Sequence, residues 1–426
     1  MMYFERGSRT DVITADDTRA ILKQVFDSMG PRKRVLALPP DFTRFNSYAG
    51  PITEMVNDYY GDALTDVMPA LGTHSPMSDE QLSAMFPSVP KEKFRIHDWR
   101  NDIVTVGTVP GSYVKEVSEG KLDYEMSAQV NKLLLDPSFD LILSIGQVVP
   151  HEVIGMANYT KNIFVGVGGS DFINKSHFIG ATYGMERIMG RAKSPVRDVF
   201  EYAKVNFLGG VPIVYVLTVR AKDEESGEMV TRGLYIGDDF ECFQKAADLS
   251  LETNFIMLDR EIKKCIVYLD PEEFKSTWLG NKSVYRTRMA LADDAELIVL
   301  APGLKEFGED KTIDGLIRKY GYKGTPHTLE CTNANADLQA NLGASAHLIH
   351  GSSEGRFKII YCPGDGLTRE EIESVGFDYC HYDEMVARYP VETLKDGWNT
   401  MPDGEEIYYI SNPALGLWAY KERFKD

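Results

Sequence analysis

Short apolar runs that alternate with helical patterns constrain the fold of this chain more than any other feature. Several of the runs are unbroken rather than alternating in polarity, as in strands that are covered on both faces. Because strands that alternate with helices form layered sheets, the pattern predicts an α/β fold. The predicted strands lie at 34–39, 141–149, 211–219, 265–269, 296–302, 357–363 and 406–410, and predicted helices include 16–29, 239–252, 311–321 and 334–350.

The length of 426 residues exceeds what one hydrophobic core usually fills, so we expect two domains. A polar stretch at 252–264 is the best candidate for the boundary. We therefore predict domains at 1–255 and 256–426, each a mixed or parallel sheet with flanking helices. Capping boxes at Ser78 with Gln81 and at Thr368 with Glu371 predict the starts of two helices.

The composition excludes several classes of function. Acidic residues outnumber basic ones by 64 to 46, which argues against a nucleic-acid partner, because phosphate binding depends on clustered Lys and Arg. The five cysteines are scattered singly, without a CxxC pair, as in a reducing compartment, and this excludes a thiolate zinc ribbon. The first residues lack the pattern of a signal peptide and no apolar stretch approaches 18 residues, so we expect a cytoplasmic protein without membrane contact.

Polar residues follow two of the predicted strands at the point where each strand should end. Asp41 and Arg44 come after 34–39, and His151 follows 141–149. Ligands of open α/β sheets bind beyond the carboxyl ends of the strands. We therefore expect these residues to share one site.

Three histidines are candidates for proton transfer or metal binding. His74 lies in a glycine-containing loop ahead of a capped helix, where it is either a general base or a solvated loop residue. His151 is either a functional residue or a lone core histidine at a strand end. His177 follows Asn-Lys-Ser in a predicted turn, with the same two interpretations.

Lys161 lies among mostly uncharged residues. A desolvated amine has a lowered pKa and becomes nucleophilic, although most lysines are simply solvated. Asp41 and Arg44 form either a surface ion pair or a site in which the arginine binds a carboxylate or phosphate. The run GVGGSD, with Gly168 and Gly169, would let the backbone cradle a phosphate, but it lacks the spacing of a Walker motif.

In the second half, Lys282, Tyr285 and Arg286 precede a predicted buried strand. If this segment is helical, the three side chains share one face. They then either bind a ligand or form a solvated helix face.

Taken together, Asp41-x-x-Arg44, Gly72-Thr-His74, Pro150-His151, Lys161 and His177 resemble the nickel-pincer lactate racemase family of 2-hydroxyacid racemases and epimerases. The resemblance implies an N-terminal domain that carries the cofactor and a C-terminal domain that closes over it, with the active site in the interdomain cleft. The implied cofactor is a nickel-pincer nucleotide, a pyridinium mononucleotide that holds nickel through carbon and sulfur.

The resemblance also implies a role for each candidate residue. Lys161 would carry the cofactor covalently, His177 would bind nickel, and His74 and His151 would be the paired acid and base. The cofactor would further contact Asp41, Gly168 and Gly169, and the substrate would contact Arg44, Lys282, Tyr285 and Arg286.

The chain departs from the lactate enzymes in two places. Ala-Asn-Tyr-Thr precedes Lys161 where they carry a glycine-rich basic run, and the segment at 285–289 reads Tyr-Arg-Thr-Arg-Met where they use a Tyr-Gln pair and a later lysine. The extra cationic groups favour a larger, polyhydroxylated acid. We therefore predict an isomerase, a 2-epimerase of a gluconate-like or mannonate-like sugar acid.

Several alternatives remain open. The chain could be a racemase of another 2-hydroxyacid such as malate or lactate, a non-catalytic sugar-acid binding protein of the same fold, or a hydrolase with zinc on the three histidines. The expected partners are a small hydroxyacid, the enzymes that make the cofactor and, as a homo-oligomer, further copies of the chain.

Overall fold

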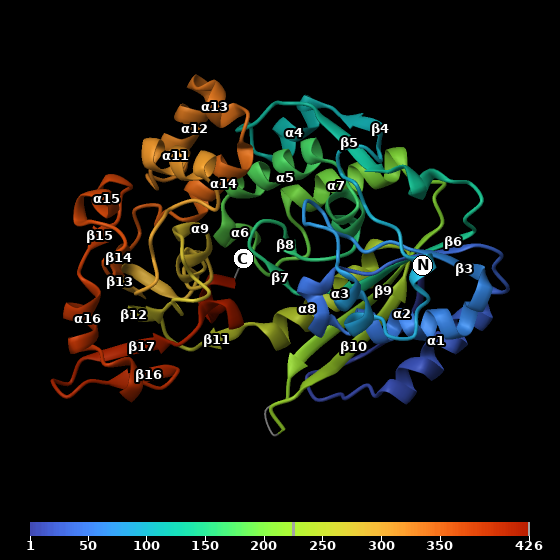
Figure 1. Cartoon of the computed structure of the whole chain (residues 1–426), viewed down its shortest axis with the longest axis horizontal. Coiled ribbons are helices and arrows are strands. Elements are labelled where there is room, and N and C mark those ends of the chain that lie inside the picture. Colours follow the sequence, from blue (N-terminus) through green and yellow to red (C-terminus); the bar gives the residue numbers. More distant parts are fainter. Residues whose placement is uncertain (224–225, 425–426) are drawn as a thin grey trace. The chain divides into compact units, whose positions relative to one another are not determined.

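The computed structural model describes residues 1–223 and 226–424, and its contacts divide the chain into two compact units (Figure 1). The first unit consists of Met1–Ile179 and Ile188–Asn254, and the second of Gly180–Arg187 and Phe255–Asp426. The chain thus enters the second unit for eight residues before it completes the first. No feature of the sequence indicated this excursion.

A six-stranded mixed sheet forms the centre of the first unit. The last four strands in its order are mutually parallel, whereas the first two pair in antiparallel fashion. The order is β1 (Met2–Gly7), β10 (Met229–Gly237), β9 (Ile213–Lys222), β6 (Leu141–Gln147), β2 (Val35–Leu38) and β3 (Leu64–Val67).

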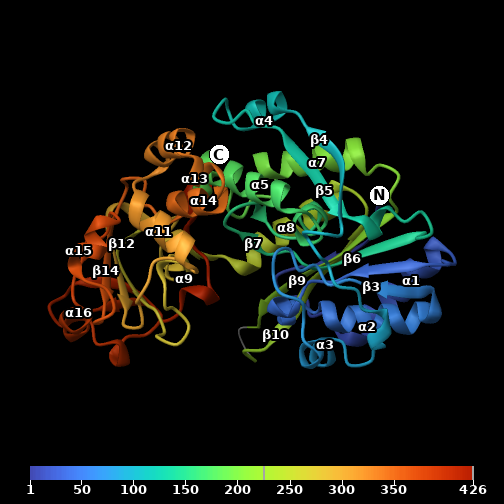
Figure 2. The same ribbon diagram turned by 45° about the horizontal axis from the view of Figure 1, so that its top comes forward.

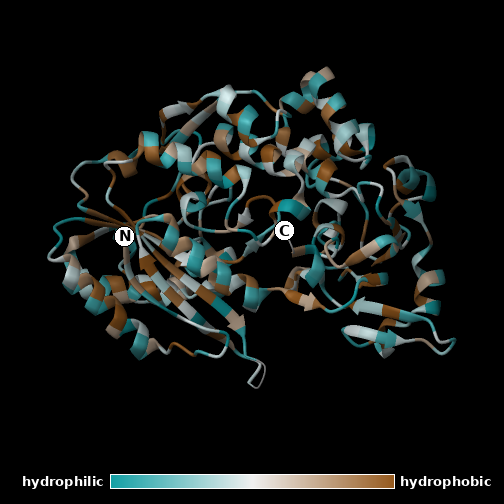
Figure 3. Ribbon diagram, turned by 180° about the vertical axis from the view of Figure 1, so that it is seen from behind, coloured by the Kyte–Doolittle hydropathy of each residue, from teal (hydrophilic) through white to brown (hydrophobic). Residues whose placement is uncertain are grey.

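Helices cover both faces of this sheet. Figure 2 shows α1 (Ala15–Met29) and α2 (Ala49–Tyr60) on one face, and α7 (Pro195–Phe207) and α8 (Phe240–Asn254) on the other. The apolar side chains of α1 and α2 form one core with those of the central strands. Figure 3 shows how hydrophobic residues gather on those strands, as their unbroken apolar runs predict.

Smaller helices and strands complete the first unit. They are α3 (Asp79–Met85), α4 (Gly111–Val117), the antiparallel pairs β4 (Ile103–Val109) with β5 (Met126–Asn131) and β7 (Pro150–His151) with β8 (Gly155–Met156), the π-helix η5 (Asn162–Gly166), α5 (Ser170–Tyr183), and the 3₁₀ helices η1 (Phe42–Ser47), η2 (Gly61–Ala63), η3 (Lys91–Lys93) and η4 (Lys132–Leu135). The last four residues of α5 belong to the second unit.

The second unit has its own six-stranded sheet, parallel except at one edge. Its order is β15 (Asp378–Tyr379), β14 (Lys358–Pro363), β13 (Leu291–Ala301), β12 (Ile262–Tyr268), β17 (Glu406–Ile410) and β16 (Gly397–Thr400), where β16 is antiparallel to β17. A separate parallel pair joins β11 (Ile256–Leu258) to β18 (Trp418–Tyr420).

Short helices surround that sheet. They are α9 (Thr277–Gly280), α10 (Lys282–Tyr285), α11 (Lys311–Tyr320), α12 (Thr325–Ala334), α13 (Ala336–Gln339), α14 (Leu342–His350), α15 (Arg369–Ser374), α16 (Tyr382–Arg388), and the 3₁₀ helices η6 (Val391–Thr393), η7 (Pro413–Leu415) and η8 (Lys421–Phe424), while α6 (Met185–Ile188) lies mostly in the excursion.

Ion pairs hold the excursion within the second unit. The Glu186 carboxylate accepts from Arg288 Nε at 3.0 Å and from Arg356 Nη2 at 2.9 Å. Because the Arg288 side chain is buried, the Glu186–Arg288 pair is shielded from solvent. Removal of Glu186 would leave the buried charge of Arg288 without this carboxylate and destabilise the second unit.

The structure confirms the α/β fold with two sheet-based units and a strand at each of the seven apolar runs. Both predicted capping boxes are present. The single helix predicted at 334–350 is wrong: Asn341 accepts a hydrogen bond from Ala344 N–H and caps a new helix, α14, after α13 has ended. Within residues 1–223 and 226–424, no helix has the length and apolar character that crossing a membrane requires.

Candidate active site

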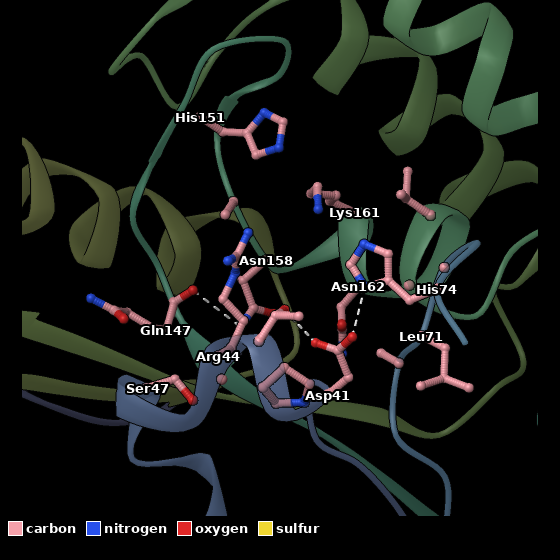
Figure 4. A pocket seen from close by; sticks show the side chains of 18 of the residues that line it. Asp41, Arg44, Ser47, Leu71, His74, Gln147, His151, Asn158, Lys161 and Asn162 are labelled. Carbon is pink, nitrogen blue, oxygen red and sulfur yellow. Dashed lines mark hydrogen bonds and ion pairs between the residues drawn. The ribbon is translucent and has the colours of Figure 1, made fainter. Parts of the chain in front are cut away.

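A cavity of about 260 Å³ opens at the carboxyl edge of the first unit's sheet. The adjacent parallel strands β2, β3 and β6 end there, and the loops that follow them supply its walls. This is where open α/β sheets place their ligands. The cavity brings together Asp41, Arg44, His74, His151, Lys161 and His177, the residues grouped from the sequence. Figure 4 labels all of them except His177.

Asp41 and His74 form a hydrogen-bonded pair. His74 Nδ1 lies 2.6 Å from Asp41 Oδ2, and Thr43 donates to the other carboxylate oxygen at 2.5 Å. Burial by itself would raise the pKa of Asp41, but the hydrogen bonds from His74 and Thr43 outweigh it and hold that pKa below its usual value. Since an ionised carboxylate only accepts, His74 Nδ1 carries a proton, and in the neutral ring Nε2 is left as an acceptor.

The backbone brings His74 to this partner. Gly72 has φ of 57°, a conformation that favours glycine, and its N–H donates to Gly166 O at 2.8 Å. The loop after β3 is thereby tied to the end of the π-helix η5. His74 itself remains more than half exposed, so its Nε2 is open to a ligand.

His151 presents the opposite arrangement. Its Nδ1 accepts a hydrogen bond from Val153 N–H at 3.1 Å, so the neutral ring carries its proton on Nε2. Burial, and next the neighbouring charges of Lys161 and His177, hold the pKa of His151 well below its usual value, although Glu152 opposes them. The cavity is therefore lined by one imidazole that accepts at Nε2 and one that donates there.

Lys161 lies in the cavity wall between these histidines (Figure 4). Burial, followed by the positive charge of Arg44, lowers the pKa of its amine to about 8. A substantial fraction of the amine is then neutral near physiological pH. This agrees with the sequence-based expectation of a nucleophilic lysine.

Two asparagines beside Lys161 were missed by the sequence reading. Asn162 Nδ2 donates to Leu38 O at 3.1 Å and to Ser144 Oγ at 2.9 Å, and so links the start of η5 to the end of β2 and the middle of β6. Asn158 lines the cavity in a left-handed conformation. Their position next to the lysine was the only sequence signal of a role.

His177 lies on helix α5, so the turn predicted around it is wrong. Ser170–Tyr183 is helical because Asp171 stands in the first turn and no proline interrupts the run. His177 Nδ1 donates to Ile173 O at 2.7 Å, one turn earlier, which leaves Nε2 as the only free ring nitrogen. A carbonyl on the second nitrogen is the usual support of a metal-binding histidine.

Gly168 and Gly169 do not line the cavity. A Cβ on Gly168 would lie 2.0 Å from Phe164 O, and one on Gly169 would lie 2.3 Å from Gln129 Oε1. Gly168 O also accepts from the buried His97 at 3.0 Å. These glycines therefore permit close backbone packing against β5, and nothing in their surroundings supports the predicted phosphate cradle.

Lys282, Tyr285 and Arg286 belong to the second unit, where α10 forms one short helical segment. Tyr285 is buried, and Arg286 Nη1 donates to Ala414 O at 2.9 Å. Arg286 therefore holds the segment at η7. A substrate contact by any of the three residues stays a prediction.

The side chains of the cavity that could bind a metal suit one that already carries other ligands. Across the described parts of the chain, no group of three His, Cys, Asp or Glu side chains is arranged to hold a metal ion, which argues against zinc on His74, His151 and His177. His177 Nε2 can supply one ligand, and the amine of Lys161 can form a covalent bond to a carrier of the rest. The site thus fits an amine-tethered metal cofactor.

Comparisons with known proteins place part of the chain beside one family. Residues 7–187 match the family model described as the lactate racemase N-terminal domain. No curated protein matches the chain in sequence.

Two solved structures share the fold. A protein from Thermotoga maritima is 22% identical with a TM-score of 0.76, and the match covers 98% of this chain and 100% of that chain. The lactate racemase apoprotein from Thermoanaerobacterium thermosaccharolyticum is 15% identical with a TM-score of 0.63, and the match covers 91% of this chain and 87% of that chain.

Proposed function

We propose that this chain is an isomerase of the lactate racemase type that inverts C2 of a 2-hydroxyacid. One observation carries the proposal: a single cavity presents two imidazoles with opposite hydrogen-bonding states at Nε2, beside an amine of lowered pKa. Inversion of a secondary alcohol through its ketone needs one group that takes the hydroxyl proton and another that returns a proton to the oxygen after the ketone has presented its other face. The match to the lactate racemase N-terminal domain supports the same assignment.

The residues present fit the nickel-pincer nucleotide that the resemblance implies. Lys161 would hold it covalently through its amine, and His177 Nε2 would bind the nickel. When bound, this group supplies an acceptor for the carbon-bound hydrogen of the substrate, which leaves as hydride. The protein contributes orientation and proton transfer.

His74 and His151 divide the proton transfer. In one direction His74 Nε2 takes the hydroxyl proton, and the Asp41 carboxylate stabilises the resulting imidazolium. His151 Nε2–H donates to the substrate oxygen when the hydrogen returns to the opposite face of C2, which inverts the configuration, and the roles reverse in the other direction. A positioned acid or base of this kind contributes roughly 10²- to 10⁴-fold to the rate.

We propose that Arg44 binds the substrate carboxylate. It lines the cavity beside Lys161, and a guanidinium matches the two oxygens of a carboxylate. The negative charge of a bound carboxylate would also offset the repulsion between the positive charges of Arg44 and Lys161. We therefore assign substrate orientation to Arg44.

The substrate we propose is a sugar acid of the gluconate or mannonate type. Hydroxyl and amide groups of Thr43, Ser47, Gln147 and Asn158 line the cavity, which suits a chain of hydroxyl groups better than the methyl group of lactate. Malate and lactate are the alternatives. Other proposed partners are the cofactor-making enzymes and a second copy of the chain, and the proposed location is the cytoplasm.

The proposal is tested on protein made together with cofactor-making enzymes. Intact mass should show one adduct, which peptide mapping places on Lys161, and nickel should be present in equal amount. Lys161→Ala should lose the adduct, whereas His74→Ala and His151→Ala should keep it and lose turnover. An adduct that survives in Lys161→Ala contradicts the assignment of the lysine.

The same preparation identifies the substrate. Gluconate, malate and lactate are incubated separately with the adduct-bearing enzyme, and the configuration at C2 is followed. Inversion of malate or lactate but not of gluconate contradicts the sugar-acid proposal. The absence of both adduct and nickel would favour a non-catalytic binding protein of the same fold.

A further inference from the structure

We propose that Arg197 is a positioning residue that fixes the backbone ahead of Lys161 and thereby sets the place and reactivity of its amine. The inference deepens the proposed function, because it takes Lys161 as the reactive group. Arg197 lies on α7, outside the residues that line the cavity. It can act on the amine through its charge and through the segment that carries the lysine.

The guanidinium spans the segment that leads to Lys161. Arg197 Nη2 donates to Met156 O at 2.7 Å, and Nη1 donates to Asn158 O at 3.2 Å and to Thr160 Oγ1 at 2.8 Å. Lys161 N–H donates to the same Asn158 carbonyl at 3.3 Å. Arg197 thus shares an acceptor with the backbone of the lysine.

The segment needs such support because of its conformation. Asn158 and Tyr159 have φ of 68° and 58°, so two successive residues with a Cβ lie in the left-handed region. Such residues persist only where their surroundings over-determine them. Arg197 binds the carbonyl between them, and the ring of Tyr159 stacks on Phe243 at 5.1 Å.

Burial of the charged Arg197 side chain costs free energy, which a purely structural role would not require. The residue is 1% exposed, its charge lies 4.3 Å from the ring of Phe243, and its Nε has no hydrogen-bond partner among the described residues. Burial lowers its pKa to about 10, although Glu201 opposes that shift. A buried guanidinium that serves three acceptors in one loop indicates a requirement for that loop's position.

Glu201, one turn along α7, completes the support. It accepts from Thr160 Oγ1 at 3.0 Å and from the Tyr159 hydroxyl at 3.3 Å. Thr160 therefore stands between an arginine that donates to it and a carboxylate that accepts from it. Its hydroxyl fixes the peptide immediately before Lys161.

Several charged groups besides Arg197 act on the amine. Burial and Arg44 lower the pKa of Lys161, Arg197 lowers it further, and Glu152 and Asp41 raise it. His151 and His177 line the same cavity. Loss of Arg197 removes one positive charge and also frees the amine to reach solvent, and both changes raise the pKa of Lys161.

The test measures the amine directly in cofactor-free protein. Lys161 is acylated by an amine reagent at a series of pH values, and its labelling is read by peptide mass spectrometry. In the parent protein the profile should have its midpoint near the lowered pKa of about 8. Arg197→Met should move the midpoint upward by about one unit and slow labelling at pH 8 about fivefold, because a smaller fraction of the amine is neutral.

Two further variants separate positioning from general damage. Arg197→Lys keeps the charge and part of the hydrogen bonding, so it should lie between the parent and Arg197→Met. Arg232→Met is the matched control: Arg232 is also a buried arginine of the first unit, but it binds Asp11 O and the Asp223 carboxylate. It should lower stability and leave the Lys161 profile unchanged.

A folded Arg197→Met protein with the parent's labelling profile would overturn the inference. If that variant does not fold, Thr160→Val removes one of the three acceptors of Arg197 together with the hydroxyl that links Arg197 to Glu201, and an unchanged labelling profile in that variant overturns the inference equally. Failure of the proposed function gives a different result. If Arg197→Met shifts the labelling profile but the cofactor-loaded parent protein never inverts a hydroxyacid, the proposed function is wrong and the positioning role of Arg197 remains.

Discussion

A single carboxylate decides which nitrogen of His74 faces the cavity. Asp41 holds Nδ1–H at 2.6 Å, so Asp41→Asn removes the charge that stabilises the imidazolium and the acceptor that fixes the ring. We expect kcat of the cofactor-loaded enzyme to fall by about 10²-fold or more with little change in KM. Thr43→Val, which leaves the carboxylate in place, should have a much smaller effect. A fall of less than about threefold in Asp41→Asn would contradict the pair's role.

A buried histidine in the second unit makes stability depend on pH. Burial lowers the pKa of His347 to about 3; its ring lies 4.2 Å from that of Trp278, and its Nε2 lies 3.0 Å from the Tyr322 hydroxyl. Between pH 3 and 6.5 the unfolded chain binds this proton and the folded chain does not, so folding is weakened as pH falls. The thermal midpoint of His347→Gln should therefore drop less between pH 7.5 and 4.5 than that of the parent protein. Equal drops would show that His347 titrates normally.

At the level of single residues, the sequence indicated the chemistry of a side chain better than it indicated which groups that side chain contacts. Lys161 was expected to be desolvated because of its uncharged neighbours, and its pKa is indeed lowered. The sequence did not indicate that Arg286 donates to a backbone carbonyl far along the chain, and its predicted substrate contact stays a prediction. Arg197 carried no signal, since its partners are carbonyls of a loop whose left-handed turn depends on the tertiary fold.

At the level of elements, two helical glycines differ in what surrounds them. A Cβ on Gly50 in α2 would lie 2.2 Å from Met85 O of α3, whereas one on Gly315 in α11 meets nothing within 4 Å. Gly50→Ala should lower the free energy of unfolding by about 1 to 3 kcal/mol, because backbone has to move. Gly315→Ala should raise it by about 0.5 to 1 kcal/mol through helix propensity. Chemical denaturation measures both, and destabilisation by both substitutions would contradict the packing described for α2.

The elements themselves were largely predictable, and the exceptions have local causes. Unbroken apolar runs give buried parallel strands, which is why every predicted strand is present. The helix around His177 was missed because its glycine-rich start resembles a loop. The break before α14 depends on the side chain of Asn341, which caps a new helix. The continuous apolar pattern had suggested a single unbroken helix at 334–350.

At the level of the whole molecule, the strand order explains why distant residues meet. Asp41, His74 and His151 follow β2, β3 and β6, which are parallel neighbours, so their loops emerge at one edge. The sequence predicted from strand ends that Asp41 and His151 share a site, whereas His74 joined them through the family resemblance, because β3 was not predicted. It did not predict the eight-residue excursion at Gly180–Arg187, which is held by arginines from positions 288 and 356.

The central claim is that the histidines move only the hydroxyl proton, while the hydrogen on C2 leaves and returns as hydride. The most direct test uses a 2-hydroxyacid deuterated at C2, incubated in ordinary water with enzyme that carries the Lys161 adduct. The account predicts that the inverted product keeps its deuterium, because hydride does not exchange with solvent. Loss of the deuterium to water in step with inversion would show that a histidine removes the carbon-bound hydrogen as a proton, and would contradict the account.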